Sequence, residues 1–452
     1  MFINVVLHIT TIKRTTWNGF DAKSPARWKN AKGKSHGSLV DSGTIDGLML
    51  RFSTAGESHG EGLLALLTGL PAGLRVDRDF IDHELWRRQQ GYGRGGRQRI
   101  EQDHAHFLSG VRHGATIGSP VAIMLANRDW DNWREALPVE AGDPAKHRAL
   151  AAPRPGHADL AGALKFNFPD ARYVLERASA RETTARVAAG AVTKLLLRAL
   201  GIEVLSHVVA VGGARSPKPV TWKQIQELYA KPEVLLNCAD PEAEQRFKGE
   251  VDRVLRTKDT VGGVFEVVAH HVPPGLGSMA SWDERLDAKL AAALMSMQAV
   301  KAVEIGDGVA NAARPGSEAH DEIGWRSQPL AVQEAPAGGE LDAGYTNFTR
   351  SSNRAGGIEG GMSNGQDIVV RGYLKPISTL RSPLQSVDFA TRQPVKAAYE
   401  RSDVCVVPAG GVVGEAMVAL VLAGCVLEKF GGDSMDELRR NVQGYAAQLQ
   451  RF

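Results

Sequence analysis

Two histidines lie in polar, glycine-bearing segments that show no apolar periodicity. His59 lies in STAGESHGEG, residues 53–62, and His157 lies in RPGHAD, residues 154–159. Histidine changes charge near neutral pH, so the first hypothesis for each residue is a proton donor to an anionic substrate. The alternative is a solvated histidine on a surface turn, since loop residues often only connect elements.

Arginine outnumbers lysine in two short clusters. They fall within residues 87–99 and 172–186 and contain Arg87, Arg88, Arg94, Arg97, Arg99, Arg172, Arg177, Arg181 and Arg186. The guanidinium fork suits carboxylate and phosphate groups, so an anionic small molecule is the expected partner. A solvated basic face is the alternative. The net charge of +3 is too small to indicate nucleic acid by itself.

The overall composition is that of an ordinary globular protein, with 43% hydrophobic and 23% charged residues. The cysteines, Cys238, Cys405 and Cys425, are far apart and lack C-x-x-C spacing. This pattern argues against a disulfide framework or a structural zinc site, and it fits a reducing, cytoplasmic compartment. The apolar run at 416–427 is too short to span a bilayer and predicts a buried helix.

Periodicity beyond Met49 predicts one continuous α/β domain at residues 49–452. Apolar residues repeat at helical spacing in some segments and follow strand patterns in others. The predicted helices are 78–90, 181–200 and 283–298, and the predicted strands are 121–125, 203–211, 264–270, 300–305 and 367–374. Two helix-then-strand units, 181–211 and 283–305, suggest an internal duplication. Residues 306–365 have little periodicity, so we expect function or disorder there.

Residues 1–48 differ from the rest of the chain. They are rich in basic and hydroxyl-bearing residues, and no hydrophobic stripe runs through them. This composition is compatible with a transit peptide, which would place the protein in a plastid. We favour another interpretation, in which Met49 is the true start and residues 1–48 are dispensable, because MLRFS at 49–53 begins a strand-like segment.

The segment ERASARET, residues 176–183, leads into the helix predicted at 181–200. Ser179 and Glu182 have the spacing of a capping box, so a well-capped helix accounts for this segment. A helix N-terminus flanked by arginines also binds phosphate or carboxylate well, and the two interpretations are compatible.

Other polar segments have compositions suited to ligands. GYGRGGR, residues 91–97, lacks the Gly-Lys-Ser/Thr of a Walker loop, and it follows a helix where a Rossmann fingerprint follows a strand. A flexible RNA-binding segment is one interpretation of it. SSNRAGGIEGGMSNG, residues 351–365, has the backbone donors to wrap a large polar ligand. KPIST, residues 375–379, could supply a cation to a phosphate, whereas Asp403 could simply satisfy backbone amides.

Taken together and in this order, these segments resemble the chorismate synthase family. The matching pieces begin at RFSTAGESHG, residues 51–60, and end at RSD, residues 401–403. Between them lie Arg88, GRGGR at 93–97, RPGHAD at 154–159, ASARET at 178–183, AVKAVEIG at 299–306 and the glycine-rich loop at 356–365. Each motif alone is weakly specific, whereas their order over residues 49–435 is highly specific.

The resemblance implies a carbon–oxygen lyase that catalyses the last step of the shikimate pathway in aromatic amino acid biosynthesis. The substrate would be 5-enolpyruvylshikimate 3-phosphate, and an anti 1,4-elimination would give chorismate and phosphate. The reaction requires reduced FMN although it has no net redox change. NADPH could reduce the flavin. The resemblance also suggests FAD and NADP as associated nucleotides. The family fold is a β-α-β sandwich with an internal pseudo-repeat, assembled as a homotetramer, with no nucleic-acid or membrane partner.

Roles follow from position in the family's motifs. His59 would protonate the departing phosphate or hold its charge. His157 would supply a proton near the flavin, and Asp403 would assist the flavin nitrogen that removes the ring hydrogen. Arg88 and Arg94 match positions associated with NADPH, though they could equally clamp substrate. The residues that match flavin-contacting segments are Arg177, Ala178, Ser179, Gln298, Ala299, Gly360, Lys375, Pro376, Ile377, Ser378, Thr379 and Arg401. Ala178 stands where serine is common, so its contact would be through the backbone only.

Two other classes of function fit parts of the sequence. A basic, glycine-arginine RNA-binding protein would show steeply salt-dependent affinity for polynucleotides. A flavin reductase that releases FMN as a carrier would oxidise NADPH without releasing phosphate from the shikimate ester.

Overall fold

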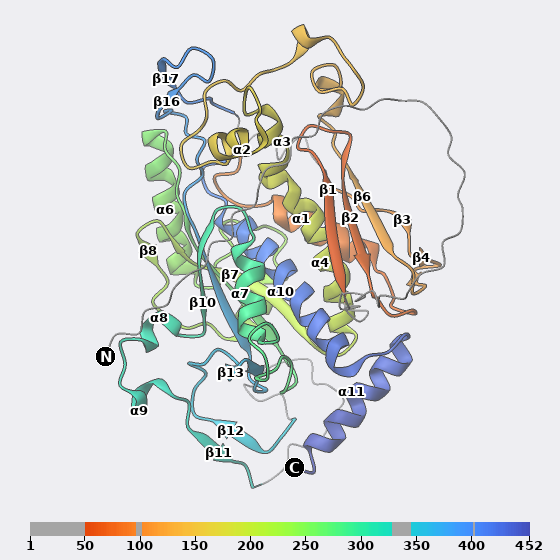
Figure 1. Ribbon diagram of the computed structural model, residues 1–452. Coiled ribbons are helices and arrows are strands. Elements are labelled where there is room, and N and C mark those ends of the chain that lie inside the picture. The colour runs from red at the N-terminus through yellow and green to blue at the C-terminus, as the bar shows by residue number, and fades with distance from the viewer. Residues whose placement is uncertain (1–49, 96–101, 328–344, 401–402) are drawn as a thin grey trace, which may run out of the picture. The chain divides into compact units, whose positions relative to one another are not determined.

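Two antiparallel sheets organise the fold in the computed structural model, which describes residues 50–95, 102–327, 345–400 and 403–452 (Figure 1). The first sheet has the strand order β1-β2-β6-β3, with bounds Arg51–Gly56, Gly62–Thr68, Val121–Ala126 and His106–Ser109. The second has the order β10-β15-β9-β7-β8, with bounds Val300–Ile305, Ile368–Leu374, Gly263–His270, Glu203–Val211 and Ala214–Arg215. The expectations for residues 1–48 and Arg401 lie outside the described residues.

Apart from inserted elements, the two sheets belong to two repeats of one topology. Each repeat runs strand, strand, helix, strand, strand, helix, and in each the fourth strand lies between the second and the third. The helices are α1 (Arg78–Gln89) and α4 (Thr183–Arg198) in the first repeat, and α7 (Leu286–Met295) and α10 (Val407–Phe430) in the second. An internal duplication is therefore present, but its units are not the two expected helix-then-strand pairs. The topology instead matches α4 with α10 and α1 with α7.

Helices fill the space between the sheets. α4 packs against β2 and β6, α10 packs against β7 and β9, and α4 and α10 pack against each other. The layers therefore follow the order sheet, helices, sheet, which is the expected β-α-β sandwich of α+β class (Figure 1). A Cβ at Gly190 in α4 would lie 2.3 Å from the Cβ of Ala416 in α10, so this close approach of the two helices requires glycine.

The helix α10 is longer than its apolar run suggests. It has 24 residues, whereas the apolar run at 416–427 covers only half of it. By length and composition the whole helix could cross a bilayer, so the expectation that this segment is too short to do so is wrong. However, 89% of its apolar window is buried inside the protein, where it packs against α4 and the second sheet. The prediction of a buried helix is confirmed.

A network of buried charges lies between α1, α4 and α10. Arg87 Nη1 lies 3.1 Å from Glu84 Oε1, and Arg87 Nη2 lies 2.8 Å from Glu415 Oε1. Lys194 Nζ lies 2.7 Å from Glu84 Oε2 and 2.6 Å from Glu415 Oε2. All four side chains are at most 5% exposed, so each buried charge is compensated by its neighbours. Burial would raise the pKa of Glu84, but Lys194 and Arg87 outweigh it and lower the pKa to about 2.

Most expected elements begin and end close to the observed positions. The strands β7 and β10 match fully, and α1 ends one residue before the expected bound. The helix α4 begins at Thr183, after a 3-10 turn at Ala180–Glu182. Ser179 caps that turn by accepting from the Arg181 amide, while the Glu182 carboxylate accepts from Thr54 Oγ1 at 2.6 Å. The predicted capping box is therefore wrong, because Glu182 is bound to β1.

Short elements occupy the described part of residues 306–365, where the sequence shows little periodicity. They are single helical turns and two-stranded sheets: α8 (Gly308–Asn311), α9 (Gly316–Ala319), β11 (Ile323–Trp325), β12 (Phe348–Arg350), β13 (Ile358–Glu359) and β14 (Met362–Ser363). Further helices surround the sandwich: α2 (Asp159–Phe166), α3 (Arg172–Ala178), α5 (Trp222–Tyr229), α6 (Pro241–Thr257) and α11 (Met435–Leu449). The small strands are β4 (Val111–Arg112), β5 (Ala115–Thr116), β16 (Gln385–Val387) and β17 (Pro394–Lys396).

Candidate active site

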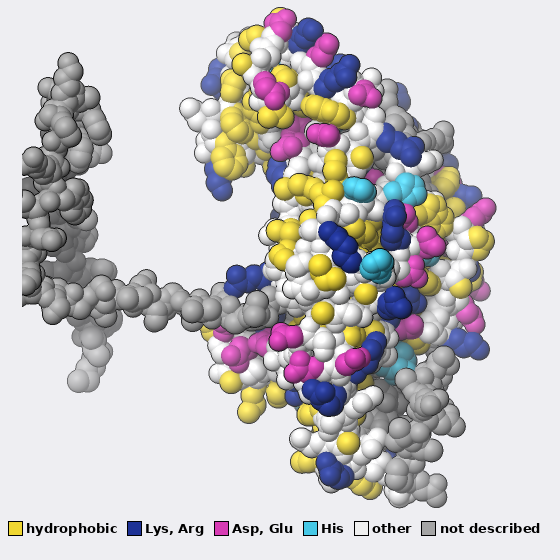
Figure 2. Space-filling model, turned by 90° about the vertical axis from the view of Figure 1, so that its right-hand side faces the viewer, with side chains coloured by type: hydrophobic (Ala, Val, Ile, Leu, Met, Phe, Trp, Pro, Cys, Tyr) yellow, Lys and Arg dark blue, Asp and Glu magenta, His cyan; other side chains and the backbone are white. Residues whose placement is uncertain are grey.

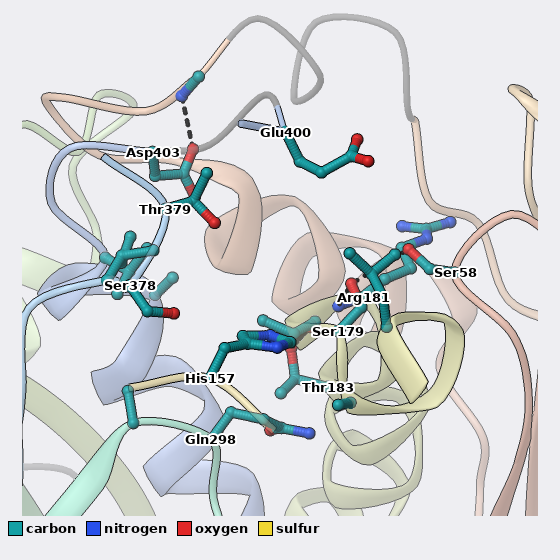
Figure 3. A pocket seen from close by; sticks show the side chains of 18 of the residues that line it. Ser58, His157, Ser179, Arg181, Thr183, Gln298, Ser378, Thr379, Glu400 and Asp403 are labelled. Carbon is teal, nitrogen blue, oxygen red and sulfur yellow. Dashed lines mark hydrogen bonds between the residues drawn. The ribbon is translucent and has the colours of Figure 1, made fainter. Parts of the chain in front are cut away.

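A cavity of about 780 Å³ lies where the central helices of both repeats, α4 and α10, begin (Figure 3). Thr183 and Ala409 line it from the N-terminal turns of α4 and α10, whose dipoles favour anions there. The connections from the last strand to the last helix of each repeat, residues 127–182 and 375–406, supply most of the other lining residues. The duplicated topology thus brings equivalent parts of both repeats to one site.

The ring of His59, in the β1–β2 loop, is held on two sides. Its Nδ1 lies 2.9 Å from Glu176 Oε1, and its backbone amide donates to Glu176 Oε2 at 2.8 Å. The ring stacks on Trp133, with the ring centroids 4.0 Å apart. His59 is only 6% exposed, so the alternative of a solvated surface histidine is wrong for this residue.

His157 forms a cluster with Arg154 and Asp159 at the start of α2. Its Nδ1 lies 2.5 Å from Asp159 Oδ1, and Arg154 Nε donates to Asp159 Oδ2 at 2.7 Å. Arg154 Nη1 also donates to Thr379 Oγ1 at 3.0 Å, which ties the two long connections together. Burial would raise the pKa of Asp159, but hydrogen bonds from His157 and Arg154 hold that pKa well below its usual range. Asp159 is therefore a stable anion behind the His157 ring.

One carboxylate, Asp103, lies between two arginines of the cavity wall. Arg88 Nη2 lies 3.0 Å from Asp103 Oδ2, and Arg181 Nη1 lies 2.7 Å from Asp103 Oδ1. Burial would raise the pKa of Asp103, but the two guanidinium groups outweigh it and lower the pKa. Burial is the main cause that lowers the pKa of Arg88 to about 10. Asp103 acts to raise this pKa, whereas the positive charges of Arg181 and Arg94 act to lower it. Two guanidinium groups share one carboxylate, so net positive charge remains for an anionic ligand.

Further cations line the same cavity. Arg94 Nη1 lies 2.9 Å from Asp403 Oδ2, and the Gly95 amide donates to Asp403 Oδ1 at 2.5 Å. The guanidinium of Arg148 lies 4.5 Å from the centroid of a Trp133 ring. Lys375 Nζ donates to the carbonyl oxygen of Gly156 at 2.6 Å, and burial lowers the pKa of this lysine.

Some buried polar atoms on lining residues lack a hydrogen-bond partner among the described residues. They are Arg88 Nε, Arg94 Nε and Gln298 Oε1. The amide of Gln298 is oriented because its Nε2 donates to Glu182 Oε2 at 3.0 Å. Buried polar groups are normally hydrogen-bonded. The two arginine Nε–H groups could therefore donate to acceptor atoms of a ligand, and Gln298 Oε1 could accept from a ligand donor.

Most site residues expected from the sequence line this cavity, and Figure 3 labels several of them. They are His59, His157, Asp403, Arg88, Arg94, Ala178, Ser179, Gln298, Ala299, Lys375, Ile377, Ser378 and Thr379. Arg177 does not line it, because its guanidinium turns back to the carbonyl oxygens of Thr54 and Gly56 on β1. Gly360 lies in the β13–β14 turn, and neither it nor Pro376 is a lining residue. The flavin contacts of these three residues stay predictions.

The cavity also involves residues that the sequence argument did not select. Glu176, Asp159 and Arg154 lie inside the quoted motifs, and their closeness in sequence to a histidine or a cap was the available signal. Asp103, Trp133 and Arg148 lie outside those motifs, in segments without apolar periodicity, and gave no signal.

The glycine-rich loop at 351–365 does not line the cavity, and its expected wrapping of a ligand stays a prediction. Gly356 has a φ of +64°, and a Cβ there would lie 2.4 Å from the Gly306 amide nitrogen. Asn353 fixes the loop by accepting from the Gly357 amide at 2.7 Å and donating to the Asp367 carbonyl at 2.8 Å. These glycines therefore allow backbone to pack on backbone.

The fold and the site define a protein whose cavity, lined by guanidinium groups, is suited to a small anionic molecule. Residues 50–427 match the family model described as chorismate synthase. The chain is 68% identical over 405 residues to the chorismate synthase of Koribacter versatilis and 66% identical over 404 residues to that of Acidobacterium capsulatum, covering 89% of this chain and 100% of each relative. A crystal structure of chorismate synthase matches with a TM-score of 0.68 at 39% identity, over 89% of this chain and 99% of that chain. The chain belongs to the chorismate synthase family, and it is a carbon–oxygen lyase.

Proposed function

We propose that the cavity binds 5-enolpyruvylshikimate 3-phosphate beside reduced FMN and eliminates phosphate to give chorismate, as the last step of the shikimate pathway. The proposal rests on one observation: two buried or half-buried histidines, each backed by a carboxylate, share a cavity with several guanidinium groups. Elimination of phosphate requires cations that hold the substrate's anionic groups and an acid for the leaving group.

The arginines of the cavity would bind the substrate. Two carboxylates and one phosphate make the substrate strongly anionic, and Arg88, Arg94, Arg148 and Arg181 offer forked donors for them. We assign Arg88 and Arg94 to the substrate rather than to NADPH, because they line the same cavity as both histidines. The unpartnered Nε atoms of these two residues support this assignment.

The cavity also fits a flavin. Its volume of about 780 Å³ lies in the upper half of the range of ligand pockets, roughly 300–1,000 Å³. Gln298 would accept a hydrogen bond from the ring system, Ala178, Ser179 and Ala299 would contact it, and Lys375 with Ile377, Ser378 and Thr379 would hold its phosphate. When bound, reduced FMN would supply electron density and the nitrogen that takes up the ring hydrogen.

Three side chains would manage the protons. His59 would donate from Nε2 to the departing phosphate, because its Nδ1 faces Glu176. His157 would supply a proton near the flavin in the same way, with Asp159 at its Nδ1. Asp403, which Arg94 and the Gly95 amide hold in this structure, would assist the flavin nitrogen once substrate has taken its place at Arg94.

We also propose a cytoplasmic homotetramer with no nucleic-acid or membrane partner. The outer face of the first sheet supports assembly, because Leu64, Leu66 and Leu108 are 41%, 42% and 48% exposed. Figure 2 faces the side on which this sheet lies in Figure 1, and hydrophobic side chains are spread there among histidines and charged groups. Exposed apolar surface of this kind commonly marks an interface.

The decisive experiment is anaerobic phosphate release from the substrate with dithionite-reduced FMN, followed by the same assay with NADPH and FMN. Equal amounts of phosphate and chorismate in the first assay support the proposal, and no release refutes it. Release in the second assay means that the protein reduces its own flavin. NADPH oxidation without phosphate release would favour a flavin reductase, and salt-dependent retention of polynucleotide on a filter would favour RNA binding.

A further inference from the structure

Each cavity histidine has a buried carboxylate at the same ring nitrogen. Glu176 Oε1 and Oε2 lie 2.9 and 3.1 Å from His59 Nδ1, and Asp159 Oδ1 lies 2.5 Å from His157 Nδ1. The Glu176 and Asp159 side chains are 4% and 0% exposed. Two unrelated segments, α3 and the first turn of α2, therefore provide the same arrangement.

The partners of Asp159 determine which atom of His157 carries hydrogen. Arg154 can only donate, and its Nη2 donates to Asp159 Oδ1 at 2.9 Å. The distance from Arg154 Nη2 to His157 Nδ1 is longer, at 3.1 Å, than the 2.5 Å between Nδ1 and Asp159 Oδ1, so the carboxylate is the main partner of Nδ1. Asp159 is anionic and can only accept, so an unprotonated Nδ1 at 2.5 Å would repel it. Nδ1 therefore carries a hydrogen that it donates to Asp159, and Nε2 is the nitrogen left for the reaction.

The same reasoning applies to His59. Glu176 Oε2 accepts the His59 backbone amide at 2.8 Å, and Arg172 Nη1 lies 3.7 Å from Glu176 Oε1, which favours an ionised carboxylate. An ionised carboxylate accepts from Nδ1–H. The stacked Trp133 ring restricts rotation of the imidazole, so the orientation of Nε2 is fixed.

We infer that Glu176 and Asp159 are positioning residues that hold His59 and His157 with a hydrogen on Nδ1, so that each Nε2 takes up a proton and, as the imidazolium, gives it to a ligand. The inference rests on the proposed function, because it concerns the same two histidines. The carboxylates need not touch substrate or flavin. They act through the histidines, as the aspartate of a serine-protease triad acts through its histidine.

Glu176→Gln and Asp159→Asn test the inference, because an amide keeps the size of the carboxylate but can donate to Nδ1 and favour the other tautomer. We expect kcat to fall by about 10²–10⁴-fold, the usual contribution of general acid–base groups, with a much smaller change in KM. Glu176→Asp and Asp159→Glu retain the charge and should recover part of kcat. Asp82→Asn is the matched control. Asp82 Oδ2 lies 2.8 Å from His104 Nδ1, and neither residue lines the cavity, so this variant should keep the wild-type kcat.

A readout independent of activity is the tautomer itself, measured by nitrogen-15 NMR on histidine-labelled protein, with His59→Ala and His157→Ala for assignment. The wild-type protein should show Nδ1–H at both residues, and the amide variants should gain the Nε2–H form. Wild-type kcat in both amide variants, or Nε2–H tautomers in the wild-type protein, would overturn the inference. A wild-type protein that releases no phosphate would instead refute the proposed function, while the tautomer measurement would still decide the positioning.

Discussion

Arg94 and Asp403 form an ion pair across the two repeats, with Arg94 Nη1 2.9 Å from Asp403 Oδ2. Arg94 follows α1 of the first repeat, and Asp403 precedes α10 of the second. Both line the cavity, so an anionic substrate that binds Arg94 would compete with Asp403 for the guanidinium. Substrate binding and release of the Asp403 carboxylate would then favour each other.

Arg94→Gln tests this competition. Loss of a hydrogen bond to a charged group costs about 1.5–3 kcal/mol, so we expect KM for the substrate to rise by roughly 10- to 150-fold. The measurement is the initial rate of phosphate release against substrate concentration with reduced FMN in excess. Arg112→Gln is the control, because Arg112 is an exposed residue of β4 outside the cavity. An unchanged KM in the Arg94 variant would mean that Arg94 does not bind substrate.

His59→Ala and His157→Ala should each lower kcat by about 10²–10⁴-fold, because each removes a proposed proton donor. Single-turnover phosphate release with prereduced FMN measures the chemical step in both variants. His104→Ala is a suitable control, since this histidine is exposed and does not line the cavity. If both cavity variants turned over at the wild-type rate, the assignment of proton donors would be wrong.

The local elements could be predicted from the sequence, whereas the way they combine could not. The helix α1 and the strand β7 follow from periodicities within a few residues. The matching of α4 with α10 depends on strand order and on long connections between strand and helix that share no pattern. Motif order identified the residues near His59 and His157, but the carboxylates behind them come from segments interpreted as helix caps or loop ends. The capping-box interpretation of Glu182 failed because a residue distant in sequence, Thr54, takes its carboxylate.

Glu84→Gln should destabilise the protein in a pH-dependent way. The pKa of Glu84 falls from 4.5 to about 2 on folding. The ionised carboxylate therefore stabilises the native state fully above pH 4.5, and this stabilisation is lost as the pH falls through 2. Breaking a buried ion pair costs about 3–5 kcal/mol, so the variant should be less stable by that order near pH 7. The difference from wild type should shrink between pH 4.5 and 2.

Urea unfolding over this pH range measures the effect of Glu84. The control is Glu428→Gln, which removes a more exposed partner of Lys289, whose Nζ lies 2.8 Å from Glu428 Oε2. Pairs of this kind contribute about 0–1 kcal/mol. A difference between wild type and Glu84→Gln that stays constant from pH 7 to 2 would contradict the assignment.

A chain that begins at Met49 should keep the stability and activity of the full chain. The family match begins at residue 50, and the cavity is lined by residues from Ser58 onward. The experiment compares the Tm and the rate of phosphate release of the two chains under identical conditions. A shortened chain that failed to fold, or lost activity, would mean that residues 1–48 contribute to the enzyme.

Leu66→Lys should disrupt assembly while leaving the subunit folded. Leu66 faces outward from β2, opposite Ser53 of β1 and Ala122 of β6, and its exposure of 42% lets a lysine reach solvent without entering the core. A buried lysine in an interface between copies would cost several kcal/mol, so the tetramer should dissociate. Sedimentation velocity measures the assembly, and Tm reports the fold. Leu384→Lys is the control, because Leu384 is similarly exposed on a different part of the chain. A Leu66 variant that sediments as the wild type does would exclude this sheet face as the interface.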